Sequence, residues 1–195
     1  MEEQPLELLL VRHGESYHNR DGTGGLDSDL TELGVEQARR LAPWLAADFK
    51  FAAIYSSPLV RARLTAEIAA AELSLPIQFK DDLREVDFEI GPMMAHSTDP
   101  ISAFLRVPRA IETMPASYIE FEARVRSAFC DIIAANERGT LLVFTHGGVI
   151  STFLRTVFGA HQVSVHADNG SAMLLRWGNG RWYLVYSNRV PPILP

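Results

Sequence analysis

Cysteine is almost absent from this sequence, since Cys130 is the single one among 195 residues. No disulfide can therefore form within the chain. No apolar run approaches the roughly 20 residues that cross a bilayer, and the acidic start, Met-Glu-Glu-Gln-Pro, is unlike the basic n-region of a signal peptide. We expect a protein of the reducing cytoplasm with no membrane partner.

Positive charge is also scarce, because 18 Lys and Arg face 24 Asp and Glu, for a formal net charge of −6. This balance argues against broad binding to nucleic acids or anionic membranes. It leaves room for a small anionic substrate, since a local basic pocket can exist within an acidic surface. The length predicts a single domain over residues 1–195, and a homodimer is compatible with these numbers.

Short apolar runs alternate with segments of helical periodicity. Strands are expected at 6–11, 52–56, 76–79 and 140–145, and helices at 31–47, 57–72, 117–136 and 149–158. Residues 171–177 and 182–187 flank Gly-Asn-Gly and predict a hairpin. This alternation predicts a three-layer α/β/α fold with a mostly parallel central sheet. Residues 18–29 are expected to form a loop.

Several finer predictions concern helix ends and helix faces. Ser57 before Pro58 is the pattern of a helix cap, and Ser117-x-x-Glu120 is the pattern of a capping box. Leu33 belongs to the apolar stripe expected for the helix after Thr31. Cys130 is expected in the core, because it falls among apolar residues of an amphipathic helix.

The segment Arg12-His13-Gly14 follows the first apolar run directly, and Thr145-His146-Gly147 follows a later one. In a parallel sheet both histidines project from the same edge, where open α/β sheets bind ligands. His146 also precedes a helix N-terminus, whose free N–H groups favour an anion. Two histidines at one such edge predict a reactive site there.

The residue types at this edge suit attack on phosphorus. An imidazole can be the nucleophile at His13 if its other ring nitrogen donates to a backbone carbonyl. Arg12 can hold phosphate oxygens bidentately, and Arg61 lies one turn into the helix after Ser57. Glu85 follows the third strand and is a candidate general acid, although nearby cations would be expected to keep its carboxyl group ionised until phosphate binds.

With these residues in order, the sequence resembles the histidine phosphatase superfamily in its phosphoglycerate-mutase-like branch. The resemblance rests on motifs spread over most of the chain: Arg12-His-Gly-Glu-Ser16 with Asn19, Leu30-Thr-Glu-Leu-Gly34 with Gln37-Ala38, Ser56-Ser-Pro-Leu-x-Arg-Ala62 with Thr65-Ala66, Leu83-x-Glu85, Thr145-His-Gly-Gly148 and Asn169-Gly-Ser171.

The resemblance implies a phosphoglycerate-mutase-like fold and a covalent phosphohistidine on His13, with no metal and no cofactor. It implies a phosphate pocket of Arg12, Arg61 and His146, with Glu85 as proton donor. Asn19 and a backbone N–H of Gly147 would add phosphate contacts. Glu15 and Ser16 would support the loop.

Three functions follow from this resemblance. The leading one is a metal-independent phosphatase that acts on small phosphomonoesters. A phosphoglycerate mutase is the alternative within the fold, but the tryptophan found in many relatives is missing from Glu85-Val-Asp-Phe-Glu-Ile-Gly-Pro92, and the mutases' longer basic insertion is absent. A non-catalytic phosphate-binding module is the third.

The segment 87–116 is expected to be an irregular excursion on the substrate side, broken by prolines. Its cations are Arg106 and Arg109. Its apolar residues Met93, Met94, Phe104 and Met114 suit either a lid over the substrate or ordinary packing.

Overall fold

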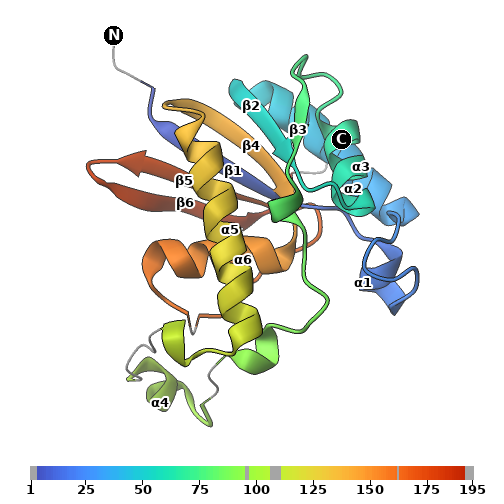
Figure 1. Ribbon diagram of the computed structural model, residues 1–195. Helices are drawn as coiled ribbons and strands as arrows, with labels where there is room; N and C mark the ends of the chain where they lie inside the picture. The colour runs from blue at the N-terminus through green and yellow to red at the C-terminus, as the bar shows by residue number, and fades with distance from the viewer. Residues whose placement is uncertain (1–3, 95–96, 106–110, 162, 192–195) are drawn as a thin grey trace.

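The computed structural model describes residues 4–94, 97–105, 111–161 and 163–191. Its centre is a sheet of six strands in the order β3-β2-β4-β1-β5-β6 within these residues (Figure 1). In chain order the strands are β1 (Leu6–Arg12), β2 (Phe51–Ser56), β3 (Ile77–Phe79), β4 (Gly139–Thr145), β5 (Ala172–Gly178) and β6 (Arg181–Arg189). Strands β3, β2, β4 and β1 pair in parallel, whereas β5 and β6 are antiparallel. The predicted fold class is confirmed.

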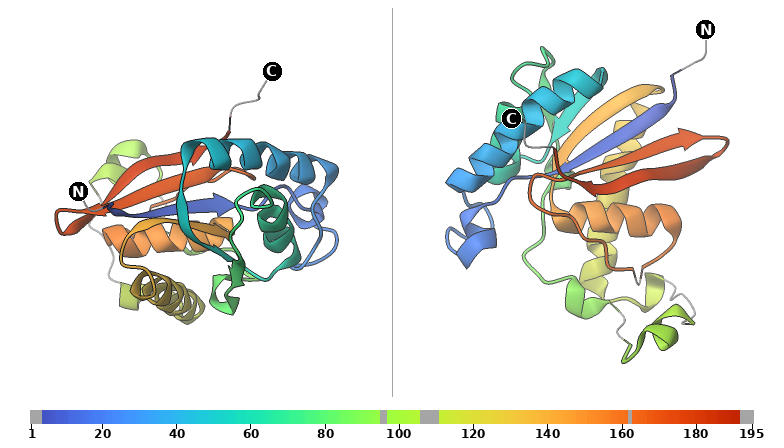
Figure 2. Two further views of the ribbon diagram at one scale, coloured as in Figure 1. Left: turned by 90° about the horizontal axis from the view of Figure 1, so that it is seen from above. Right: turned by 180° about the vertical axis from the view of Figure 1, so that it is seen from behind.

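Helices cover both faces of the sheet. One face packs against α5 (Ala116–Ala134) and α6 (Gly147–Phe158), and the other against α2 (Glu32–Asp48) and α3 (Val60–Ala69). Figure 2 shows α2 and the pair α5 and α6 on opposite sides of the strands. Alternate residues of β1 divide between the layers, so that Leu8 and Leu10 face α5 and α6 whereas Leu9 and Val11 face α2 and α3.

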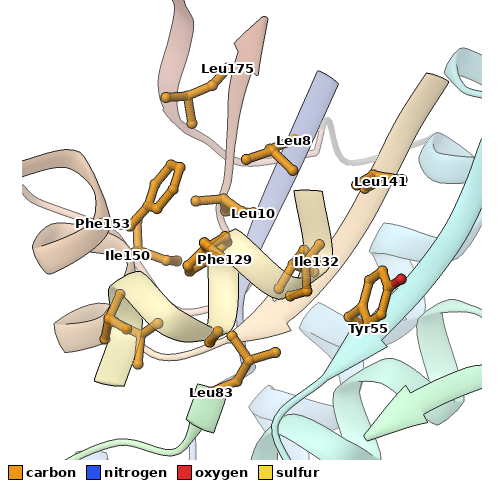
Figure 3. Packing of buried hydrophobic residues seen from close by; sticks show 14 of the residues in the cluster. Leu8, Leu10, Tyr55, Leu83, Phe129, Ile132, Leu141, Ile150, Phe153 and Leu175 are labelled. Atoms are coloured by element: carbon orange, nitrogen blue, oxygen red, sulfur yellow. The ribbon is translucent and has the colours of Figure 1, made fainter. Parts of the chain in front are cut away.

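The larger core cluster lies under α5 and α6 (Figure 3). Phe129 of α5 and Phe153 of α6 have ring centroids 4.1 Å apart, and the side chains of Leu8 and Leu10 are fully buried beneath them. Burial of aliphatic side chains of this size contributes roughly 1.5–3 kcal/mol each. This packing fixes the position of β1 and β4 relative to α6. It therefore also fixes the position of the residues that follow these two strands.

Register brings the ends of β1 and β4 to the same level. Arg12, the last residue of β1, pairs with Thr145, the last residue of β4, so His13 and His146 stand side by side. The His13 N–H continues the ladder by donating to the Thr145 carbonyl at 3.0 Å. Both strands are buried because they lie at the centre of the sheet.

Helix ends differ from the predictions at several positions. The segment 18–29 contains a short helix, α1 (Tyr17–Asp21), capped by the Ser16 hydroxyl. The helix expected at Ser57 begins at Val60. Pro115 stands at the N-cap of α5, so the capping box predicted at Ser117 was wrong. Thr31 does cap α2, and Pro43 lies within that helix without dividing it.

Two predictions of burial were also wrong. Leu33 is 49% exposed, because α2 turns its Gly34 and Ala38 side toward the molecule instead. Cys130 is exposed on α5, although its neighbours Phe129 and Val125 are buried. In both cases the residue lies just outside the buried apolar face of its helix, and this face is narrower than the sequence of the helix suggests.

The segment 87–116 leaves the sheet after η1 (Asp81–Leu83). Its described residues form short helical turns: η2 (Gly91–Met93), α4 (Pro100–Phe104) and η3 (Ile111–Thr113). Figure 1 shows α4 beyond the end of α5 that lies away from the sheet. Met94 and Met114 are buried against Tyr118 of α5, which is ordinary packing rather than a lid. His96, Arg106 and Arg109 lie outside the described residues, as does the side chain of Phe104.

Candidate active site

His13 is 2% exposed, and hydrogen bonds at its two ring nitrogens hold it in one orientation. Nδ1 lies 2.6 Å from the Gly14 carbonyl oxygen. A carbonyl only accepts, so Nδ1 carries the proton and Nε2 is unprotonated, with its lone pair as an acceptor. Burial, followed by the charges of Arg61 and Arg12, lowers the pKa of His13 well below its usual value. The ring is therefore neutral near pH 7.

Two arginines stand beside this lone pair. Arg61, from the first turn of α3, donates from Nε to His13 Nε2 at 3.0 Å and from Nη1 to the Leu26 carbonyl. Arg12, at the end of β1, donates from Nη1 to the Ala167 carbonyl. The Arg12 Nε is buried and has no hydrogen-bond partner among the described residues. Two guanidinium groups beside one imidazole make a strongly electropositive spot that suits an anion.

His146 lies opposite His13, with ring centroids 5.1 Å apart. It is fully buried, and its Nε2 is 2.8 Å from the Ser57 hydroxyl. Burial and the nearby His13 and Arg61 lower its pKa well below the usual value, so this ring is also neutral. A neutral imidazole offers one N–H donor and one lone pair.

Glu85 reaches the same place from the segment after η1. Its carboxylate accepts the Gly148 N–H at 2.8 Å and its neighbour's N–H, that of Val86, at 3.2 Å. Burial raises the pKa of Glu85 and outweighs the opposing effect of those two hydrogen bonds and of Arg61 and Arg12. Burial therefore has a larger effect on this pKa than the neighbouring arginines.

The approach of Glu85 to α6 needs a glycine at position 148. A Cβ there would lie 2.2 Å from Glu85 Oε1, closer than any side chain allows. Residue 147 is adjacent to Arg12, since a Cβ at Gly147 would meet the Arg12 Nε at 3.5 Å. The two glycines let a carboxylate and a guanidinium pack onto the first turn of α6.

The loop after β1 is fixed by neighbours on several elements. The Gly14 N–H donates to the Thr65 hydroxyl at 3.0 Å, and Glu15 accepts the Thr31 hydroxyl at 2.7 Å. Asn19 accepts a hydrogen bond from the Asn169 amide at 3.2 Å. The expectation that Glu15 and Ser16 support this loop fits their contacts.

All of the candidate site residues except His146 line one pocket of about 450 Å³. Its wall is formed by Arg12, His13, His18, Asn19, Leu26, Arg61, Glu85, Val86, Phe88, Ile90, Gly91, Gly147, Gly148, Ser151, Arg155, Ser164, Val165, His166 and Ala167. His146 is not one of these lining residues, but its ring lies next to that of His13. Glu85 is the one carboxylate among these lining residues of the described chain.

Within the described residues, no group of three or more His, Cys, Asp or Glu side chains is placed to hold a metal ion. The same part of the chain contains no helix long and apolar enough to cross a membrane.

Several residues that shape the site were not singled out for it from the sequence. Ser57 was predicted to cap a helix; its hydroxyl accepts the Leu59 N–H at 3.3 Å, and it also contacts His146 at 2.8 Å. Arg124 of α5 donates to the carbonyls of Asp82 and Arg84 and so holds the segment that carries Glu85. Ser57 could have been found from its position directly after a strand, whereas Arg124 lies in a helix with no motif around it.

Comparison with known proteins agrees with this geometry. The profile of the histidine phosphatase superfamily (branch 1) matches residues 8–190. A Hydrogenobacter thermophilus protein named "Putative phosphoserine phosphatase 2" is 33% identical over 94% of this chain and 95% of its own length. The metal-independent phosphoserine phosphatase of Arabidopsis thaliana is 30% identical over 77% of this chain and 68% of its own.

Solved structures share the fold. The α-ribazole phosphatase from Shigella flexneri aligns with a TM-score of 0.72 at 23% identity, over 97% of this chain and 99% of that one. The profile match covers nearly the whole chain, including both histidines and the residues around them. The chain belongs to the histidine phosphatase superfamily, branch 1.

Proposed function

We propose that this chain is a metal-independent phosphomonoesterase that transfers the phosphoryl group of a small substrate to His13 and then to water. The observation that carries the proposal is the hydrogen bond from His13 Nδ1 to the Gly14 carbonyl. It leaves Nε2 unprotonated, in a pocket that also holds Arg12, Arg61 and Glu85. An unprotonated imidazole nitrogen beside two guanidinium groups suits phosphoryl transfer.

In the first step, His13 Nε2 attacks the phosphorus and the bond from phosphorus to the ester oxygen breaks. Glu85 donates its proton to that oxygen, so the product leaves as a neutral alcohol. The raised pKa of Glu85 supports this role, because a carboxyl group must be protonated to act as the acid.

In the second step, water attacks the phosphohistidine and the P–N bond breaks. Glu85, now a carboxylate, accepts a proton from this water. His13 regains its lone pair and inorganic phosphate leaves. Each group thus returns to its starting protonation state.

Charge on the transferred phosphoryl oxygens is stabilised by Arg12 and Arg61. Each guanidinium presents fixed N–H donors, which cost little reorganisation during the reaction. The neutral His146 adds an N–H donor, and Asn19 and the Gly147 backbone N–H complete the set.

The names of relatives indicate the substrate class. Two of them are named as phosphoserine phosphatases and a third as an α-ribazole phosphatase. The substrates in these names are small phosphomonoesters, and we propose that this chain acts on the same class.

The test is hydrolysis of a panel of phosphomonoesters in the presence of EDTA. Wild type should release phosphate with the chelator present. His13→Ala should lose at least about 10³-fold in kcat, in the range seen when a catalytic nucleophile is removed. His161→Ala is the matched control, since His161 contacts Tyr118 away from the pocket wall. Equal activity in the His13 and His161 variants, or a strict need for a divalent cation, would contradict the proposal.

The same panel separates the two other functions. A mutase assay with phosphoglycerates reports transfer back to the product, and a phosphate-binding module would bind the substrates without releasing phosphate. Release of phosphate without isomerisation is the outcome expected for a phosphatase.

A further inference from the structure

Helix α6 extends the active-site pocket beyond its phosphate end. Gly147 and Gly148 stand at its first turn, and Ser151 and Arg155 follow on the same face at helical spacing, all lining one pocket. Arg155 lies eight residues after Gly147, which corresponds to about 12 Å along the helix axis. Arg155 therefore lies toward the far end of the pocket, away from His13.

Arg155 is buried, and it forms no ion pair with a carboxylate of the described residues. The residue is only 5% exposed. Nε donates to the Val163 carbonyl at 2.7 Å, whereas Nη1 is buried and has no hydrogen-bond partner among the described residues. A buried cationic nitrogen without a partner is costly, so such groups are normally paired. An anionic group bound in the pocket would satisfy this nitrogen.

The pocket wall cannot provide that anion. Glu85 is the one carboxylate among its described lining residues, and it is bound to the Gly148 and Val86 N–H groups at the other end. The remaining wall near Arg155 is formed by Ser151, Ser164 and Val165, with Phe88 and Ile90 as further apolar surface. An adjoining groove of about 390 Å³ shares Arg155, Ser164 and Val165 with the pocket. There is space for a substrate body that carries its own negative charge.

We propose that Arg155 binds a second anionic group on the leaving group of the substrate. The inference rests on the proposed phosphatase function, because it concerns the far end of the same pocket. The substrate class is then a phosphomonoester whose alcohol bears a carboxylate or a further phosphate, separated from the ester oxygen by several bonds. The shared chemistry is an oxyanion that accepts hydrogen bonds from a guanidinium.

The test compares phosphorylated ω-hydroxy acids of increasing chain length with their carboxamides, and with the bisphosphates of matching diols. Each acid and its amide have the same size and differ in one charge. Wild type should prefer the acid, or the bisphosphate, by about 10- to 100-fold in kcat/KM, the range expected for a charge-assisted hydrogen bond. The preference should peak at one chain length and reside mainly in KM.

Arg155→Met should reduce this preference to near one, and Arg155→Lys should restore part of it. Arg63→Met is the matched control, because it removes one arginine from the exposed side of α3 where Arg63 pairs with Glu67. It should keep the wild-type preference.

The inference is overturned if wild type hydrolyses acid and amide equally at every length, a result that does not depend on how any variant folds. It is also overturned if Arg155→Met lowers kcat/KM for acid and amide by the same factor, since Arg155 would then only hold the Val163 segment. A wild type that releases phosphate from none of these esters would contradict the proposed function instead. Acid and bisphosphate results together identify which oxyanion is preferred.

Discussion

The pKa values of His13 and Glu85 move in opposite directions for the same reason. Burial disfavours the charged form of each group, so it lowers the pKa of the imidazole and raises that of the carboxyl group. The result is a neutral nucleophile next to a carboxyl group that can hold a proton. These are the protonation states that the first step of phosphoryl transfer needs.

Glu85→Gln should separate substrates by their leaving groups. Without an acid, an alkyl phosphate must expel a poorly stabilised alkoxide, and we expect its hydrolysis to fall by about 10²- to 10⁴-fold. A p-nitrophenyl ester needs no protonation, so its first step should stay fast. Dephosphorylation should then be slow, because Glu85 also accepts the proton of the attacking water. Stopped-flow absorbance would show this as a burst of nitrophenol.

The control for this prediction is Glu67→Gln, which removes an exposed carboxylate on α3. It should leave both substrates at wild-type rates. An equal loss of the first step for alkyl and aryl esters in Glu85→Gln would exclude Glu85 as the acid.

At the residue scale, sequence reasoning could propose identities but not environments. Arg12, His13 and Arg61 stand in recognisable motifs after a strand or at a helix start. The shift of Glu85 depends on burial by segments distant in the chain. The unpaired state of Arg155 is likewise invisible until α6 and the Val163 segment are packed together.

At the scale of elements, the loop after β1 is clamped to the start of α2. The backbones meet with almost no space between them, since a Cβ at Gly34 would lie 1.9 Å from the Glu15 carbonyl oxygen. Thr31 caps α2 through the Gly34 N–H and also donates to the Glu15 side chain. One helix start therefore sets the position of the loop that carries His13.

Gly34→Ala should push these backbones apart. We expect a loss of about 1–3 kcal/mol in the free energy of unfolding, as for other overpacked sites, together with a lower kcat/KM. Leu33→Ala is the control on the neighbouring position, and because Leu33 is exposed it should change stability by less than about 0.5 kcal/mol. Urea unfolding followed by circular dichroism measures both. Equal stability of the two variants would show that the clamp is not tight.

Element boundaries were less predictable than the elements themselves. The sequence pattern at Ser57 is a good helix cap, but His146 lies 2.8 Å from its hydroxyl and the helix begins three residues later. The contact between Ser57 and His146, which follow two different strands, outweighs the local preference of Ser57 for a helix cap. Thr31, whose cap is a local interaction, was predicted correctly.

At the scale of the whole molecule, His13 and His146, which follow β1 and β4, are both buried in their neutral form. In the unfolded chain a histidine has a pKa near 6.5 and takes up a proton below it, whereas the lowered pKa of His13 and His146 prevents this in the folded chain. The sign follows from proton binding: above about pH 6.5 neither state is charged, and stability is lost as the pH falls toward the folded-state pKa.

His146→Asn removes one of these two groups. The free energy of unfolding of wild type should fall, relative to that of the variant, by about 1 kcal/mol between pH 7.5 and 5.5. The comparison cancels the opposing contribution of Glu85, whose raised pKa favours the folded state at lower pH. Denaturant titrations at the two pH values measure the difference. A gap between the two proteins that does not change with pH would contradict a neutral His146.

The alternation of strands and helices along the sequence predicts the fold class, because a parallel sheet requires helical crossovers between its strands. Alternation could not supply the strand order, in which β1 and β4 become neighbours at the centre although more than 120 residues separate them. That pairing is what sets His13 beside His146. A single domain over 1–195 and a homodimer remain predictions.

The central claim is that His13 carries the phosphoryl group. The most direct measurement is trapping with a radiolabelled phosphomonoester, an alkaline quench and peptide mapping by mass spectrometry. We expect one label per chain at His13, stable to alkali and lost in acid, at a level that rises in Glu85→Gln because dephosphorylation is slowed. Turnover without any labelled intermediate, or label on a residue other than His13, would contradict this account.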